Sequence, residues 1–156
     1  MTAARTIPAP EAPSANTAAA AMAADWADAW NRHDIDGLTR LVHPDIDFVT
    51  VAGVWLRGAE AFRRHHAEIH RLQMRDSVWR NIDQTARRLR DTLVLVHLRW
   101  AMQGDRDPDG TPRQPRRGIF SWLVEWPAEG NARIIAGQNT NLRSDVDAHG
   151  DEGAAP

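Results

Sequence analysis

Residues 115–142, PRRGIFSWLVEWPAEGNARIIAGQNTNL, decide the fold. They predict two strands, residues 116–126 and 132–141, joined by a turn that contains Pro and Gly. The second strand is apolar through Gly137 and then ends in the polar run Gln-Asn-Thr-Asn at residues 138–141. Because successive strand residues point to opposite faces, amides at the end of an apolar strand can point into a hollow beneath a curved sheet. The stretch therefore predicts an open sheet with a ligand cavity on its concave face.

The first half of the chain has a helical pattern. Apolar residues at helical spacing predict three helices, over residues 16–33, 34–42 and 59–72. Ser14 or Asn16 is placed to cap the first helix, and Asp34 to cap the second. Pro44 follows the second helix, and we expect the helix to stop there because residues before a proline disfavour the helical conformation.

Strand patterns fill the rest of the chain. They cover residues 47–52 and 54–56, on either side of Gly53, and then residues 78–88, 92–103, 116–126 and 132–141. Helices and a short strand pair followed by four long strands form an α+β arrangement. We therefore expect a cone-shaped, curved antiparallel sheet, with the three helices of the N-terminal half packed on its concave face.

The composition excludes several kinds of chemistry. The absence of Cys excludes disulfides, thiolate nucleophiles and Cys-ligated metals, and the absence of Tyr excludes a phenolic acid or oxyanion donor. All 19 basic residues are Arg, which excludes a Schiff-base lysine. The net charge of −2 indicates neither a nucleic-acid partner nor a membrane surface. We expect a small-molecule ligand, with no metal and no cofactor.

The chain length favours one domain, which we place at residues 19–143. Residues 1–18 are rich in Ala, Pro and Thr and lack the apolar stretch of a signal peptide, and residues 144–156 are acidic and small. We expect both segments to be disordered tails. No run of 18 apolar residues exists, so we expect a cytoplasmic protein.

Six short motifs occur in an order that carries a resemblance. They are AWNRHD (29–34), DFVTVAGVWLRG (47–58), HAEIH (66–70), VHLRW (96–100), PRRG (115–118) and AGQNT (136–140). With this order the chain resembles the nuclear transport factor two-like (SnoaL-like) superfamily and, within it, the SgcJ/EcaC group. The resemblance implies a dimeric, cone-shaped domain with a buried pocket, often encoded near secondary-metabolite pathways. That group is often labelled oxidoreductase, but this sequence has no nucleotide loop, Cys pair or flavin motif.

Two histidines are candidate catalytic groups. His66 and His70 are one helical turn apart, a spacing that lets two imidazoles share a substrate or a metal. No third ligand is in an obvious place, so we favour an acid/base role for His66 over metal binding. The alternative is that His66 is a core histidine with a backbone or carboxylate partner.

Arg116 and Arg117 open an apolar strand, so one faces inward and the other outward. The inward guanidinium would orient a carboxylate, enolate or phenolate. We choose Arg117 as the catalytic partner of His66. A salt bridge to Asp47 or Glu60 would explain the arginine equally well.

Further side chains are candidates for the pocket wall. We expect the ligand to contact Trp30, Asn31, Phe48, Trp55, Trp100, Gln138 and Asn139. For Gln138 and Asn139 the alternative is a polar network that supports the first helix through Asn31.

The alternating row Phe120, Trp122, Val124 and Trp126 indicates a homodimer interface on the convex face of the sheet, although the sequence leaves core packing open.

These observations favour a cofactor-free pocket protein. If it is an enzyme, it performs proton transfer as an isomerase, cyclase or dehydratase on an apolar cyclic or polyketide-like ligand, with His66 as the base. A different class is also open: a non-catalytic ligand-binding or association module, since the fold also resembles the association domain of calcium/calmodulin-dependent kinase.

Overall fold

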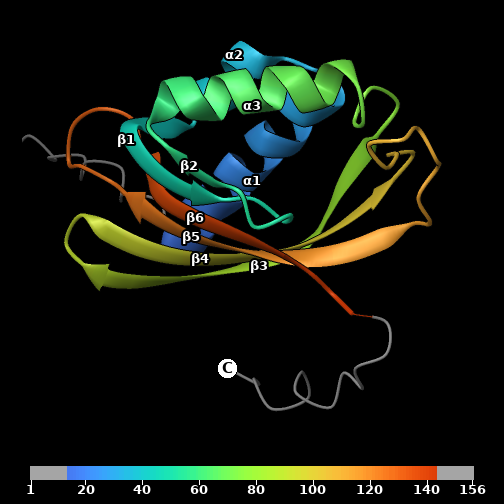
Figure 1. The fold of residues 1–156 in the computed structure, drawn as a ribbon. Coiled ribbons are helices and arrows are strands. Elements are labelled where there is room, and N and C mark those ends of the chain that lie inside the picture. Colours follow the sequence, from blue (N-terminus) through green and yellow to red (C-terminus); the bar gives the residue numbers. More distant parts are fainter. Residues whose placement is uncertain (1–13, 144–156) are drawn as a thin grey trace, which may run out of the picture.

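Six strands form one curved sheet, and three helices cover its concave face (Figure 1). The computed structural model describes residues 14–143. The elements are α1 (Ala15–Asn31), α2 (Ile35–Arg40), β1 (Val42–Val49), β2 (Trp55–Arg57), α3 (Ala59–Arg71), β3 (Val78–Arg90), β4 (Leu93–Gln103), β5 (Arg116–Glu125) and β6 (Arg133–Asn141). Within the described residues, no helix combines the length and the apolar character that crossing a membrane requires.

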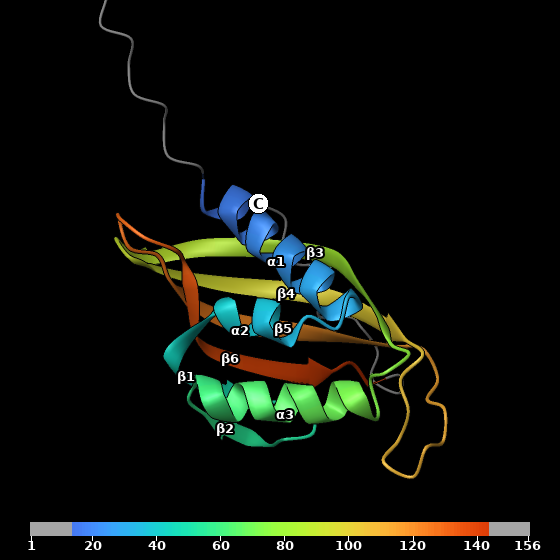
Figure 2. The ribbon, with the colours of Figure 1, turned by 90° about the horizontal axis from the view of Figure 1, so that it is seen from above.

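The strand order is β2-β1-β6-β5-β4-β3. The predicted α+β fold is confirmed, and one detail is added: β1 runs parallel to β6, so the sheet is mixed, while the other four strand pairs are antiparallel. Seen from above, α1 crosses the β3–β4 side of the sheet and α3 lies on the β1–β2 side (Figure 2). In this view (Figure 2) the short helix α2 lies between these two helices, and it contacts both of them.

Several element boundaries differ from the sequence prediction. The second helix ends at Arg40 and the first strand already begins at Val42, with Pro44 inside it. The pairing of β1 with β6 shifts register between Val42 and Asp47, so Pro44 lies in an irregular stretch where its missing N–H removes no ladder bond.

The first helix begins earlier than predicted. The Ser14 side chain caps it by accepting a hydrogen bond from the Thr17 N–H at 3.2 Å. Residues 15–18, assigned above to a disordered tail, therefore form the first turn of α1. The remaining tail residues, 1–13 and 144–156, lie outside the described residues.

The row of apolar residues on β5 faces the helices and not the outside. Phe120, Trp122 and Val124 are buried, and the rings of Phe120 and Trp122 lie 5.1 and 5.4 Å from that of Trp26 on α1. The prediction that this row is a dimer interface on the convex face is wrong. These residues form the core, because the helices cover the face to which the even-numbered residues of β5 point.

Candidate functional site

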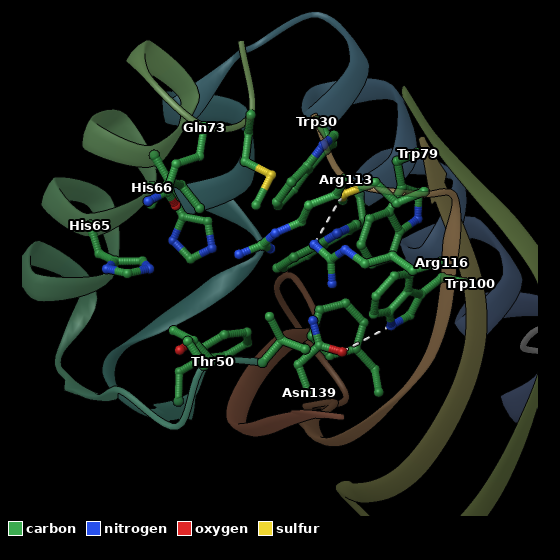
Figure 3. A pocket seen from close by; sticks show the side chains of 18 residues that line it. Trp30, Thr50, His65, His66, Gln73, Trp79, Trp100, Arg113, Arg116 and Asn139 are labelled. Carbon is green, nitrogen blue, oxygen red and sulfur yellow. Dashed lines mark hydrogen bonds between the residues drawn. The ribbon is translucent and has the colours of Figure 1, made fainter. Parts of the chain in front are cut away.

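A cavity of about 100 Å³ opens between α3, the end of α1 and the concave face of the sheet (Figure 3). Its walls are largely apolar, with a few polar groups gathered at two sides. The lining residues are Trp26, Trp30, Phe48, Thr50, Val51, Ala52, His65, His66, Ile69, Gln73, Met74, Trp79, Trp100, Met102, Arg113, Arg116, Phe120 and Asn139. An apolar pocket with a few convergent polar groups is the usual form of a small-molecule site.

Stacked aromatic rings make one wall. Trp79 and Trp100 stack with their centroids 4.7 Å apart, and Phe120 lies 5.5 Å from Trp79. The Trp100 ring crosses β5 directly over Gly118, where an added Cβ would lie 2.1 Å from a ring carbon. The Trp100 Nε1–H donates to Asn139 Oδ1 at 2.9 Å, so the polar end of β6 orients this ring. The pocket wall therefore depends on a glycine and an amide on two neighbouring strands.

His66 lies on α3 and faces the cavity from the side opposite Arg113 and Arg116 (Figure 3). Its Nδ1 is 2.8 Å from the Phe62 carbonyl oxygen, which can only accept, so Nδ1 carries the proton and Nε2 keeps its lone pair. The side chain is buried. Burial lowers its pKa to about 3, although the bond to Phe62 acts in the opposite direction. His66 is therefore a neutral imidazole whose free nitrogen is an acceptor.

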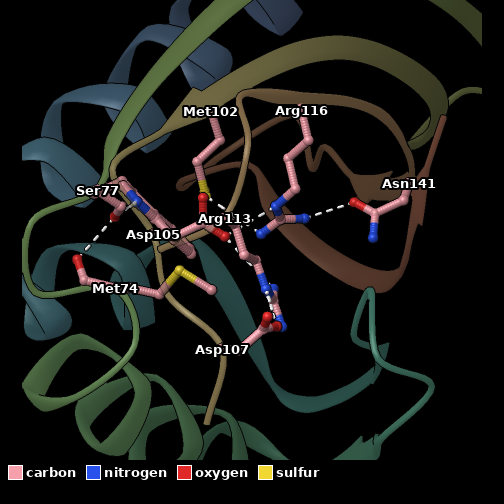
Figure 4. Close-up of polar contacts among 9 residues, drawn as sticks. Met74, Ser77, Met102, Asp105, Asp107, Arg113, Arg116 and Asn141 are labelled. Atoms are coloured by element: carbon pink, nitrogen blue, oxygen red, sulfur yellow. Dashed lines mark hydrogen bonds and ion pairs between the residues drawn. The ribbon is translucent and has the colours of Figure 1, made fainter. Parts of the chain in front are cut away.

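Arg113 and Arg116 form the second polar group of the cavity (Figure 4). The carboxylate of Asp105, whose side chain is fully buried, lies between them: its Oδ2 is 3.0 Å from Arg116 Nε and 3.5 Å from Arg113 Nη1. Asp107 accepts from Arg113 Nε at 2.6 Å. Burial lowers the pKa of the Arg116 guanidinium, and the ion pair with Asp105 acts against this. Two charged guanidinium groups are thus held at the cavity from the segment between β4 and the start of β5.

The predicted partner of His66 was the wrong arginine of the pair. Arg116 points into the cavity, whereas Arg117 is exposed and lines a depression on the convex side with Val78 and Arg80. Alternation along β5 requires this, because Phe120 and Trp122 share the inward face with Arg116. His66 and Arg117 therefore lie on opposite faces of the sheet, and that pairing is rejected.

His70 does not join His66 at the cavity. It is buried, its ring centroid lies 4.4 Å from that of Trp30, and its Nδ1 is 2.8 Å from Nδ1 of His33. One of these two nitrogens must donate and the other accept. The pair His66 and His70 thus does not act on one ligand. Among residues 14–143 no group of three or more His, Asp or Glu side chains is placed to hold a metal ion.

The predicted ligand residues divide into two groups. Trp30, Phe48, Trp100 and Asn139 line the cavity, whereas Asn31, Trp55 and Gln138 do not. Asn31 instead holds the Trp79 backbone, with Nδ2 donating to the carbonyl at 2.9 Å and Oδ1 accepting from the N–H at 2.7 Å. Trp55 is 63% exposed and donates to Asp47, and Gln138 belongs to the convex face.

Arg113 was missed, because the segment 104–115 has the composition of a turn. One signal in that segment was available: three Asp residues alternate with Arg and Pro in DRDPDGTPR, at residues 105–113. Such a pattern favours ion pairs that order a loop. It does not reveal that the loop folds back to the cavity.

The SnoaL-like domain family matches residues 23–127. No curated protein matches the sequence. Among solved structures, a Caulobacter vibrioides protein of cystatin-like fold superposes with a TM-score of 0.78 at 23% identity, covering 87% of this chain and 95% of that one.

Two further structures have names that refer to a function. One from Novosphingobium aromaticivorans, named for scytalone dehydratase, has a TM-score of 0.68 at 14% identity and covers 81% of this chain and 83% of that one. One from Xanthomonas campestris, named for the calcium/calmodulin-dependent protein kinase II association domain, has a TM-score of 0.67 at 16% identity and covers 92% of this chain and 99% of that one. At these identities the likeness concerns the fold.

Proposed function

Because the chain belongs to the SnoaL-like domain family, we propose that its cavity binds a small molecule and that His66 transfers a proton on it, in an isomerase, cyclase or dehydratase type of reaction. One observation carries the proposal: a neutral imidazole with a free Nε2 faces two guanidinium groups across an aromatic cavity. A base on one side and cations on the other are what removal of a proton from a carbon or hydroxyl requires, since the cations stabilise the developing negative charge.

The low pKa of His66 is compatible with this role. With a pKa of about 3, the buried imidazole is a weak base. An anion in the cavity stabilises the imidazolium and raises this pKa, because an opposite charge favours the ionised form. His66 thus becomes more basic when a ligand is bound and negative charge develops on that ligand.

The cavity size limits the ligand. A cavity of about 100 Å³ is of the order of the ~150 Å³ cavity that holds benzene in another protein. The part of the ligand inside the cavity is therefore about one ring, and a larger, polyketide-like molecule would insert only its end.

Membership of the SgcJ/EcaC group, a place in secondary metabolism, a cytoplasmic location and a homodimer belong to the same proposal and rest on the sequence resemblance.

Untargeted mass spectrometry of small molecules retained by the purified chain tests the proposal. Conversion of the retained compound is then followed by nuclear magnetic resonance (NMR) in deuterated water, where proton transfer introduces deuterium. We expect His66→Gln to abolish the conversion with little loss of affinity, because glutamine keeps a hydrogen-bonding group but does not take up the proton. His97→Gln, an exposed histidine on β4, is the matched control and should behave as the wild type.

A non-catalytic ligand-binding or association module is the second candidate. The small cavity volume and the Trp and Phe side chains that surround it favour this reading, as does the Xanthomonas campestris structure named for an association domain. Binding of a retained compound without conversion or deuterium incorporation would select this candidate over the enzyme.

A further inference from the structure

The two guanidinium groups at the cavity have unused hydrogen-bonding capacity. Each carries five N–H donors. Arg113 makes two hydrogen bonds, to Asp107 and Asp105, and Arg116 makes three, to Asp105, Asn141 and the Met102 sulfur. The sulfur is a weak acceptor, and the contact of Arg113 with Asp105 is long at 3.5 Å. Among the described residues the ten donors therefore make five hydrogen bonds, to four acceptor atoms, because Asp105 Oδ2 accepts from both arginines.

The surroundings of Arg116 make an additional acceptor favourable. Its side chain is only 14% exposed and its guanidinium carbon lies 5.3 Å from the centre of the Trp100 ring. A charge removed from water in this way is stabilised by hydrogen-bonded partners, and a second anionic oxygen would supply them. A flat ligand acid lying on the same ring wall could reach both arginines.

The charge balance limits the ligand to few negative charges. Arg113 and Arg116 face Asp105, which is fully buried, and Asp107, whose side chain is 47% exposed. Water screens Asp107 more than it screens the buried groups. Arg113, Arg116 and Asp105 together therefore present about one net positive charge to the cavity, which suits a monoanion.

Arg113 is supplied by a folded lobe, residues 104–115, beside the cavity. The lobe is fixed by the Arg106 N–H, which donates to the Gln73 carbonyl at 3.0 Å, and by the Arg113 N–H, which donates to the Asp105 carbonyl at 3.0 Å. A bridge between Arg106 and Pro112 closes it. Arg113 is thus presented by backbone hydrogen bonds and ion pairs, so that its guanidinium is in place before a ligand arrives.

We propose, on the basis of the function proposed above, that the ligand is a small monoanion of one ring, a carboxylate or an enolate, whose oxygens lie between Arg113 and Arg116 while its opposite edge faces His66 Nε2. Arg113 and Arg116 are then the residues that select the charge of the substrate. His66 and the tryptophan wall select its shape.

Isothermal titration calorimetry on the full chain at pH 7 tests the charge selection with three probes of similar shape: benzoate, the neutral benzamide and the dianion phthalate. We expect benzoate to bind at least tenfold more tightly than benzamide, since charge-assisted bonds to guanidinium groups are the stronger ones. Phthalate should bind more weakly than benzoate because its second carboxylate lacks a cation.

Variants of single arginines show which guanidinium groups cause the preference for benzoate over benzamide. Arg113→Gln and Arg116→Gln should each reduce the preference for benzoate over benzamide to below about threefold. Arg117→Gln and Arg80→Gln, on the exposed convex side, should keep it. Melting curves show whether each variant is folded. If Arg116→Gln is unfolded, Arg113→Gln is the decisive variant, because Arg113 lies on a surface lobe and its replacement should leave the domain folded.

Two results would overturn the proposal. The first is benzamide binding as tightly as benzoate to the wild type, and the second is an undiminished preference in Arg113→Gln together with its loss in Arg117→Gln. Either result leaves the proposed proton transfer standing, provided that neutral probes bind and His66→Gln alters their conversion. Failure of all three probes to bind at millimolar concentration overturns both.

Discussion

At the residue scale, the site depends on how burial and one hydrogen bond set the state of His66. The Phe62 carbonyl fixes the proton on Nδ1, and the apolar surroundings keep the ring neutral. The same residues in an open cleft would give an ordinary histidine that is charged below its usual pKa. The function proposed here therefore follows from the packing of His66 between Trp26 of α1 and Phe62 of its own helix as much as from the imidazole itself.

The lowered pKa of His66 predicts a pH dependence of stability. The unfolded chain binds a proton on this side chain below about pH 6.5, whereas the folded chain does so only near pH 3. Stability is therefore fully present above pH 6.5 and falls as the pH drops toward 3. We expect His66 to contribute a loss of about 2 kcal/mol in the free energy of unfolding between pH 7 and pH 5. His70, whose pKa is lowered in the same direction, adds to it.

Urea denaturation at both pH values measures this dependence. In His66→Gln the decline between pH 7 and pH 5 should be smaller than in the wild type, while the exposed His97→Gln should leave it unchanged. If stability falls equally between pH 7 and pH 5 in all three proteins, His66 is not buried in its neutral form.

One assignment of faces explains most of the residue-level errors of the sequence prediction. The sequence predicted that residues of β5 alternate between two faces. It did not reveal that the even-numbered residues are the ones that face the helices. Placing Phe120 and Trp122 outside necessarily placed Arg117 inside, because a change of one residue exchanges the two faces. The choice depends on contacts with α1, which lie far away in sequence. Trp30, Phe48, Trp100 and Asn139 were predicted as lining residues and do line the cavity.

At the element scale, Asn31 joins the end of α1 to β3. Its amide satisfies both backbone groups of Trp79, and Asn81 Nδ2 donates to the Ala23 carbonyl of the same helix at 2.8 Å. These bonds set the height of α1 above the sheet and hence one side of the cavity. A polar residue at a helix end was predicted to bind ligand, but sequence alone does not distinguish an amide that faces a ligand from one that faces a strand.

Asn31→Ala should therefore lower the free energy of unfolding by about 1–3 kcal/mol, the range for losing two backbone partners. Arg32→Ala, one residue further on the exposed surface, is the control and should change stability by less than about 0.5 kcal/mol. Chemical denaturation measures both. If Asn31→Ala is as stable as Arg32→Ala, the amide does not hold α1 on β3.

Gly118→Ala should disturb the cavity through Trp100. The added Cβ would lie 2.5 Å from the Thr140 carbonyl oxygen as well as against the indole ring, so β5 or the ring must move. We expect a loss of about 1–3 kcal/mol in unfolding free energy and a shifted Trp100 indole N–H resonance, since the bond to Asn139 depends on the ring position. Ser121→Ala, on the other face of the same strand, should leave that resonance in place.

At the scale of the whole molecule, the order of helices and strands was predictable because each pattern is local. The α+β class and the helices on the concave face follow from helical spacing in the first half and strand spacing in the second. The parallel pairing of β1 with β6 was not predictable, since it joins the two ends of the domain. The lobe at residues 104–115 was missed for the same reason: it contacts Gln73 from a distant part of the chain.

The homodimer remains a prediction, but the sheet surface that would carry it changes. Because Trp122 is in the core, Trp122→Glu should unfold the protein and not produce a folded monomer. Leu95 and Leu123 pair on the convex face and are the better contact candidates, so Leu123→Glu should shift light-scattering mass from twice 17.5 kDa to 17.5 kDa. A wild-type mass of 17.5 kDa at micromolar concentration would contradict the homodimer.

The central claim is that the cavity beneath α3 is where the protein binds its ligand, and its seven tryptophans provide a direct test. Each indole N–H gives one signal in a proton–nitrogen NMR correlation spectrum. Single-ring acids such as benzoate are titrated into the full chain while these signals are recorded. We predict that the signals of Trp30, Trp79 and Trp100, which line the cavity, shift together while those of Trp55 and Trp126 stay in place. Shifts confined to Trp55 and Trp126, or none at millimolar concentration, would contradict the claim.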